Sequence, residues 1–158
     1  MPLAKAFMAS VVHAGRIYVI GGTGSNGTNV YYDEVHVYDP MSDRWSSVRK
    51  MGERRAYVGA AVLDGCIYAI GGFNGKWLRT AERYDPREDR WRPVAPMQHE
   101  RSSFGLAVMD SALYVAGGFD GRRCLNSVLR YDPSSDGWTA VTGLPQSRYG
   151  VRLASLRW

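Results

Sequence analysis

Residues 84–91 read Tyr-Asp-Pro-Arg-Glu-Asp-Arg-Trp, and the pattern Tyr-Asp-Pro-x-x-Asp-x-Trp occurs twice more, at residues 38–45 and 131–138. A Gly-Gly pair precedes each copy, and successive tryptophans of the motif are 46 and 47 residues apart. A fixed period of this size indicates one supersecondary unit that is repeated and buries its apolar face against its neighbours. The motif therefore decides the architecture.

The second repeat predicts four short strands in an up-and-down order. Arg55 to Leu63 and Cys66 to Ile70 are apolar runs joined by Asp-Gly, a typical hairpin turn. Thr80 to Tyr84 alternates like a strand with one buried face, and Arg90 to Val94 supplies an outer strand. Repeated four-stranded sheets predict the blades of an all-β propeller. A parallel solenoid is the alternative, but it would lack Gly-Gly pairs and Tyr-Asp-Pro bends at fixed offsets.

The repeated residues have structural roles in this interpretation. The glycine pair at a strand end allows positive φ and lets a bulky neighbour approach bare backbone. Proline fixes φ at the bend, where the preceding aspartate can accept hydrogen bonds from turn amides. We expect the tryptophans to pack between adjacent blades, and we therefore assign none of these residues to a binding site.

These elements, in this order, resemble the kelch repeat family over essentially the whole chain. The segment Gly117-Gly118-Phe-Asp-Gly-Arg-Arg-Cys-Leu-Asn-Ser-Val is especially similar to the repeats of BTB-kelch ubiquitin-ligase substrate adaptors. The resemblance implies a kelch-type β-propeller of three four-stranded antiparallel blades plus the first strand of a fourth. We place the repeats at about 1–52, 53–98 and 99–145, with a remnant at 146–158.

Three blades are few for this family, whose propellers close with about five to seven. Ser147 to Leu156 matches the start of each repeat, as Lys5 to Val12 does in the first, so both ends carry an inner strand. We expect a fragment or short isoform of a longer protein. A homodimer that completes a six-bladed ring and an unusual closed geometry are the alternatives. No BTB segment is present in the sequence, so the chain could not act as a ligase adaptor unaided.

Composition narrows the class of partner. The 158 residues suit a single domain, and the net charge of +5 is carried by 17 Arg and 3 Lys. Arginine suits carboxylates and aromatic faces, which suggests an anionic partner, but charges of both signs are interspersed and nucleic acid is not expected. Two cysteines at non-equivalent repeat positions predict reduced thiols in a cytoplasmic protein. No apolar run predicts a membrane span.

A recurring cation starts each inner strand: Lys5, Arg55, Arg101 and Arg148. In the kelch adaptors that the chain resembles, arginine at this position lines the central substrate-binding face and can bind acidic peptide side chains. We therefore predict a partner-binding face formed by these four residues with Tyr57, Phe104, Tyr149, Trp77, Arg122 and Arg123. The structural alternative is that each arginine cross-links its own blade, pairing for instance with Glu53 or Glu100, and for Arg55 and Arg101 both remain open.

The predicted function is a protein-protein interaction module that binds a partner segment, and we expect this segment to be acidic. The alternative is an actin-binding cytoskeletal kelch protein, and a kelch-fold oxidase ranks last. His13, His36, His99, Cys66 and Cys124 lack the spacing of metal ligands, and no nucleophile elbow, P-loop or dinucleotide motif is present. We expect neither catalytic residues nor a cofactor.

Overall fold

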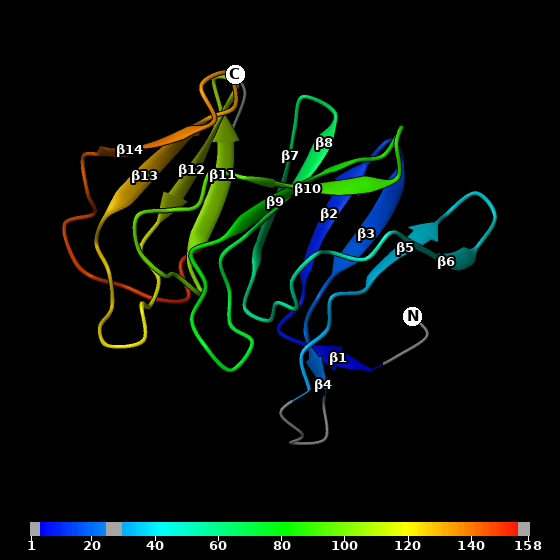
Figure 1. The fold of residues 1–158 in the computed structure, drawn as a ribbon, viewed down its shortest axis with the longest axis horizontal. Helices are drawn as coiled ribbons and strands as arrows, with labels where there is room; N and C mark the ends of the chain where they lie inside the picture. The colour runs from blue at the N-terminus through cyan, green and yellow to red at the C-terminus, as the bar shows by residue number, and fades with distance from the viewer. Residues whose placement is uncertain (1–3, 25–29, 155–158) are drawn as a thin grey trace.

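The computed structural model describes residues 4–24 and 30–154 as three four-stranded antiparallel sheets arranged like a fan (Figure 1). Blade 1 contains β2 (Ala9–His13), β3 (Arg16–Ile20), β5 (Val35–Asp39) and β6 (Arg44–Val48). Blade 2 contains β7 (Gly59–Leu63), β8 (Cys66–Ile70), β9 (Ala81–Asp85) and β10 (Arg90–Val94). Blade 3 contains β11 (Gly105–Met109), β12 (Ala112–Ala116), β13 (Val128–Asp132) and β14 (Gly137–Val141). Each sheet pairs its strands in chain order, which confirms the predicted meander.

The inner strands are shorter than the sequence predicted. The run from Arg55 to Leu63 forms a strand only from Gly59, because Tyr57 takes a positive φ of 52° and interrupts the ladder. Residues 55–58 are instead a lead-in segment, tied to the next connection by a single bridge between Ala56 and Phe73. In blade 1 the corresponding bridge extends to a two-stranded sheet of β1 (Lys5–Ala6) and β4 (Thr23–Gly24).

The turns follow the chemistry of their residues. Asp64 and Gly65, which join β7 to β8, have φ values of 50° and 75°, as a two-residue hairpin with a type I′ turn requires. At the bend between β9 and β10, Asp85 Oδ1 accepts a hydrogen bond of 2.9 Å from the amide of Arg87. The other two Tyr-Asp-Pro copies contain the same bond, so the predicted role of the aspartate is confirmed.

The core lies between the blades. One apolar cluster joins blade 1 to blade 2 and includes Trp91, and the other joins blade 2 to blade 3 and has Trp138 packed against it. The two indoles also donate hydrogen bonds to the preceding blade connection, at the carbonyls of Arg49 (2.9 Å) and Ala95 (2.8 Å). The predicted packing of these two tryptophans between blades is confirmed. Trp45 has no blade before it among the described residues and is only partly buried.

The Gly-Gly pairs allow the next lead-in segment to approach the end of the second strand. Gly71 has a φ of 58°, and a Cβ there would collide with the carbonyl oxygen of Arg101. The amide of Gly72 donates a hydrogen bond of 2.9 Å to that same oxygen. The glycine pair therefore fixes where the lead-in of the next blade crosses the preceding one.

The described part of the last segment, residues 147–154, contains no strand. A single bridge joins Arg148 to Leu125, and Val151 and Leu153 lie against Gly105 of β11. Residues 155 and 156 of the predicted strand lie outside the described residues. The segment covers β11 much as Phe104 and Leu106 cover Gly59 of β7, which is the place of a following inner strand. In the part of the chain that the structure covers, no helix is long and apolar enough for a membrane crossing.

Candidate functional site

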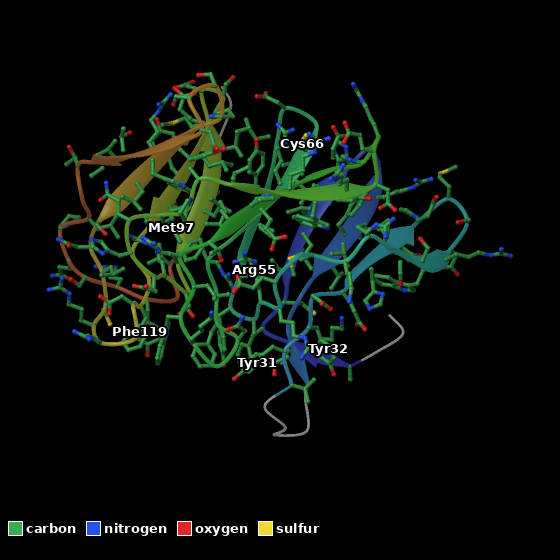
Figure 2. The ribbon with its side chains drawn as sticks, in the orientation of Figure 1. Tyr31, Tyr32, Arg55, Cys66, Met97 and Phe119 are labelled. Atoms are coloured by element: carbon green, nitrogen blue, oxygen red, sulfur yellow. The ribbon has the colours of Figure 1, made fainter. Side chains whose placement is uncertain are left out.

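One end of the fan gathers the lead-in segments and the connections between second and third strands, and we call it the loop face. Figure 2 shows Tyr31, Tyr32 and Phe119 at this end, with Cys66 toward the opposite end of the sheets. All predicted partner-binding residues belong to segments that reach the loop face, but their side chains do not share one environment.

Arg55 is buried within its own blade, with no exposed surface. Its Nη1 atom donates to the carbonyl oxygens of Gly71 (2.9 Å) and Thr80 (3.0 Å), and its Nη2 atom lies 3.1 Å from Glu82 Oε1. Glu82 also accepts a hydrogen bond of 2.6 Å from the amide of Gly52. This network joins blade 2 to the connection that precedes it, and it favours the structural alternative for Arg55.

Arg101 occupies the equivalent place in blade 3 and is 1% exposed. Its Nη1 atom donates to the carbonyl oxygens of Gly117 (2.6 Å) and Ser127 (3.0 Å), and Nη2 donates to Ser127 Oγ at 2.7 Å. Leu129 stands where blade 2 has Glu82, so among the described residues no carboxylate forms an ion pair with this guanidinium. Burial accordingly lowers the pKa of Arg101 to about 10.

Two further predicted residues are buried, which contradicts the exposure expected for them. The Lys5 ammonium is enclosed, lies 2.8 Å from Glu34 Oε2 and sits over the ring of Tyr32 at 4.5 Å. Phe104 is 7% exposed and packs in the core between blades 2 and 3. Because Lys5, Arg55, Arg101 and Phe104 are held inside, the structure does not offer them to a partner on the loop face.

The remaining predicted residues are accessible and gather around a pocket. The pocket has a volume of about 470 Å³ and lies where blades 2 and 3 meet on the loop face. It is lined by Tyr57, Phe73, Trp77, Ser102, Ser103, Phe119, Cys124 and Tyr149. Trp77 and Tyr149 keep 37% and 70% of their surfaces exposed, so a ligand could bury them further. The lining is mostly aromatic, which suits an apolar or aromatic side chain.

The wall of the pocket is built from loops that contact one another. The Trp77 ring lies 4.9 Å from that of Phe73 and 5.9 Å from that of Phe119, so it joins the connections of two blades. Gly121 supports it from the next loop, because a Cβ at Gly121 would lie 2.7 Å from the indole. Tyr31 extends the aromatic row into blade 1, at 5.5 Å from Phe73. Trp77 is therefore positioned by packing on both sides.

A row of strained backbone forms the centre of the loop face. Phe7, Tyr57 and Ser103 have φ values between 52° and 55°, and Gly150 has 67°. Tyr57, Ser103 and Gly150 each donate the backbone amide to the carbonyl of the equivalent residue in the preceding repeat, as from Tyr57 to Phe7 at 2.8 Å. Positive φ in bulky residues costs about 1–3 kcal/mol and is concentrated at functional sites. Phe7 stacks on Tyr57 with a centroid distance of 4.2 Å, and it stays 55% exposed.

Cations lie next to the pocket on the exposed loop of blade 3 and on the last segment. Arg122 and Arg123 are exposed, and their amides each donate a hydrogen bond of 2.8 Å to Asp120 Oδ1. These two amide bonds, Arg123 first, lower the pKa of Asp120. Arg148 is also exposed, and its side chain contacts Gln146 at 3.3 Å. Three guanidinium groups can therefore meet a ligand at the side of an aromatic pocket.

Sequence reasoning missed part of the lining, namely Phe73, Phe119, Ser102, Ser103 and Cys124. Phe73 and Phe119 follow the Gly-Gly pair in two repeats, so their repetition made them resemble scaffold. Their absence from the first repeat, where Thr23 stands, was the available signal. Within residues 4–24 and 30–154, no group of three or more His, Cys, Asp or Glu side chains could hold a metal ion, and both cysteines are free thiols.

The fold and this loop face define the class of protein. The family described as Kelch motif matches residues 4–52, 54–98 and 100–145, so the chain belongs to the kelch repeat family. The chain is 16% identical to a protein in a solved structure described as "Structure of YjhT", with a TM-score of 0.79, covering 92% of this chain and 54% of the other. At that identity the likeness shows the fold, a kelch β-propeller.

Several curated proteins each match less than half of the chain. Human Kelch-like protein 28 is 38% identical over 66 residues, which are 39% of this chain and 12% of the relative. Kelch-like ECH-associated protein 1B of Danio rerio is 43% identical over 77 residues, or 48% and 13%. Beta-scruin of Limulus polyphemus is 38% identical over 76 residues, or 46% and 8%. The matched region is thus a small fraction of each relative.

Proposed function

We propose that this chain is a protein-interaction module that binds a short partner segment in the aromatic pocket of the loop face. The segment would place an apolar or aromatic side chain between Trp77 and Tyr149, with acidic side chains toward Arg122, Arg123 and Arg148. The support comes from the pocket itself, since large, rigid aromatic side chains and arginine are the usual anchors at interfaces. Kelch-like relatives are consistent with this class of function.

The proposal changes the chemistry expected from the sequence. The predicted site relied largely on the repeated cations of the inner strands, but of these only Arg148 is accessible. The other accessible cations of the site, Arg122 and Arg123, lie in a connection that differs between repeats. A purely acidic ligand would leave the apolar pocket empty. We therefore infer that the apolar side chain supplies most of the affinity and that exposed guanidinium groups supply orientation and faster association.

Selection from a randomised peptide library on the immobilised chain tests the proposal. We expect enriched peptides to combine an aromatic or large aliphatic residue with nearby Asp or Glu, and Trp77→Ala to weaken their binding at least about tenfold. Arg123→Ala should weaken binding less and reduce its salt dependence. The matched control is Met41→Ala, because Met41 is 96% exposed on the turn between β5 and β6. Peptides whose binding ignores both Trp77 and Arg123 would refute the proposal.

Actin binding remains the alternative prediction, and it predicts a different experimental result. Filament co-sedimentation that is weakened by salt and lost in Arg122→Ala or Arg123→Ala would support it over peptide capture. The absence of co-sedimentation would remove it.

A further inference from the structure

The Asp and Trp of the Tyr-Asp-Pro-x-x-Asp-x-Trp motif hold the backbone of one residue from the preceding blade, and we call this pair the Asp–Trp clamp. In blade 2, Asp89 accepts the amide of Arg49 at 2.9 Å while Trp91 Nε1 donates to the Arg49 carbonyl at 2.9 Å. In blade 3, Asp136 and Trp138 make the same two bonds, each of 2.8 Å, with Ala95. The clamp holds Arg49 and Ala95 in the same way, so it binds the backbone of a residue and does not depend on the side chain.

The clamp of blade 1 has the same shape but holds nothing among the described residues. Asp43 accepts the hydroxyl of Tyr38 at 2.7 Å, as Asp89 and Asp136 accept the equivalent tyrosines. The Tyr38 and Trp45 rings are 5.2 Å apart at 40°, close to the 5.2 Å and 34° of the filled clamp in blade 2. The site for a backbone segment is therefore preformed.

The face around the open clamp is apolar. Met8, Val12 and Ile17 are 40%, 67% and 37% exposed. Their equivalents in blade 2 are Val58, Val62 and Ile67, which all pack in the cluster between blades 1 and 2. The outer face of blade 3 is apolar in the same way. Met109 and Val141, equivalent to Leu63 and Val94 of the second cluster, are 50% and 39% exposed. Each end face thus repeats one side of an interface that exists inside the chain.

The residue that such a clamp would hold is present at the far end of the array. Thr142 follows β14 directly, as Arg49 follows β6 and Ala95 follows β10, and it is exposed. Two residues further on, the amide of Leu144 donates to the carbonyl of Asn126 at 2.7 Å, as Met51 and Met97 donate to Asp33 and Arg79. Thr142 is therefore presented like the two residues that are already clamped.

We propose that two copies of this chain join head to tail, with Asp43 and Trp45 of each copy clamping the Thr142 backbone of the other. Both junctions then repeat the blade-to-blade interface found twice within the chain, and the six blades close into a ring. The solved relative is consistent with this size, because the chain aligns with 54% of it. The contact pairs different faces, so repeated copies form either a closed ring or an open filament, and closure at two copies gives the six-bladed ring.

Closure requires one rearrangement. Val151 and Leu153 cover Gly105 at the inner edge of blade 3, where β2 of the second copy must pack. Residues 147–154 leave this place when the ring forms. The backbone amides of this segment should therefore exchange hydrogen faster as the dimer forms, while those around Gly105 should remain protected.

Sedimentation velocity of the full 158-residue chain over a range of concentrations tests the proposal, and a species of twice 17.6 kDa is expected. Thr142→Pro removes the amide that Asp43 accepts, and it should weaken the dimer at least about tenfold. Thr142→Ala keeps the backbone donor and should dimerise like the parent. Trp45→Ala should weaken the dimer as well, whereas Trp77→Ala in the loop-face pocket should not.

Two further measurements keep the result independent of folding. Thermal unfolding of dilute, monomeric protein should be alike for Thr142→Pro and Thr142→Ala, because no hydrogen bond joins residue 142 to another blade among the described residues of one copy. Mixing an Asp43→Cys chain with a Thr142→Cys chain should give an intermolecular disulfide, which the same mixture with Arg92→Cys in place of Thr142→Cys should not. A chain that is monomeric at every concentration, that forms open polymers, or whose dimer ignores both Thr142→Pro and Trp45→Ala overturns the proposal.

Discussion

Replacing Arg55 by alanine should destabilise the whole array, although the position resembles a ligand-binding arginine in sequence. The change leaves Glu82, which is 7% exposed, without its cation, and it removes the donor to the Gly71 and Thr80 carbonyls. Removing one member of a buried ion pair costs about 3–5 kcal/mol. In a domain of this size that corresponds to a fall in Tm of about 6–20 °C.

The matched control is Arg148→Ala, at the same position of the repeat. Arg148 is exposed, and among the described residues its side chain forms a hydrogen bond only to Gln146, so its loss should change stability by no more than about 0.5 kcal/mol. Arg101→Ala should fall between the two, at about 1–3 kcal/mol, because carbonyls lose a donor while an unneutralised buried charge is also removed. Differential scanning calorimetry of the three variants measures the order. Equal Tm values for Arg55→Ala and Arg148→Ala would refute the assignment of Arg55 to the scaffold.

Three other perturbations test the scaffold. Trp91→Ala should cost about 3–5 kcal/mol in urea unfolding, since it removes interface packing and an indole hydrogen bond, and an unchanged midpoint would contradict this role. Gly71→Ala should destabilise by more than about 1 kcal/mol and by clearly more than Gly65→Ala, because both have positive φ but only Gly71 would collide with backbone. Burial and the nearby Lys5 ammonium lower the pKa of His36 in the folded chain. As the pH falls below about 6.5, the unfolded chain therefore takes up a proton at His36 before the folded chain does, and stability should fall. In His36→Gln the change of Tm between pH 7 and 5 should be smaller.

The repeat made the fold predictable because each repeated residue has a structural role that depends on a few neighbouring residues. The Asp85 turn bond and the Gly71 close approach depend on neighbours only a few residues away or on one fixed contact in the next unit. The strand bounds at Cys66–Ile70 and Arg90–Val94 were predicted correctly for the same reason. The lead-in of the inner strand was not, because the positive φ of Tyr57 arises from hydrogen bonds to other blades, which no local pattern records.

The site was less predictable, because position in the repeat does not determine environment. Arg55 and Arg101 fill a socket in their own blade, formed by carbonyls of the second and third strands. Arg148 has the same place in the repeat, but no described strand forms a socket around it, so its guanidinium is exposed beside the pocket. The sequence could assign all three to one role, either binding or scaffold. A binding role does not fit the buried Arg55 and Arg101, and a scaffold role does not fit the exposed Arg148. What distinguishes Arg148 from the other two is that the described residues contain no fourth blade to enclose it.

The environment of Arg148 depends on whether a further blade follows blade 3. Arg148 therefore connects the proposed peptide binding at the loop face with the proposed head-to-tail dimer. If a second copy supplies the next blade, residues 147–154 leave Gly105 and Arg148 and Tyr149 move with them. The half of the pocket formed by Trp77, Phe73 and Phe119 stays, because it is fixed by ring contacts between blades 2 and 3. Peptide binding that depends on Trp77 in both forms, but on Tyr149 only in the monomer, would therefore separate the part of the site that belongs to the loops from the part that belongs to the open end. Equal dependence on Tyr149 in both forms would mean that the last segment keeps its place in the dimer, against the rearrangement that the closed ring requires.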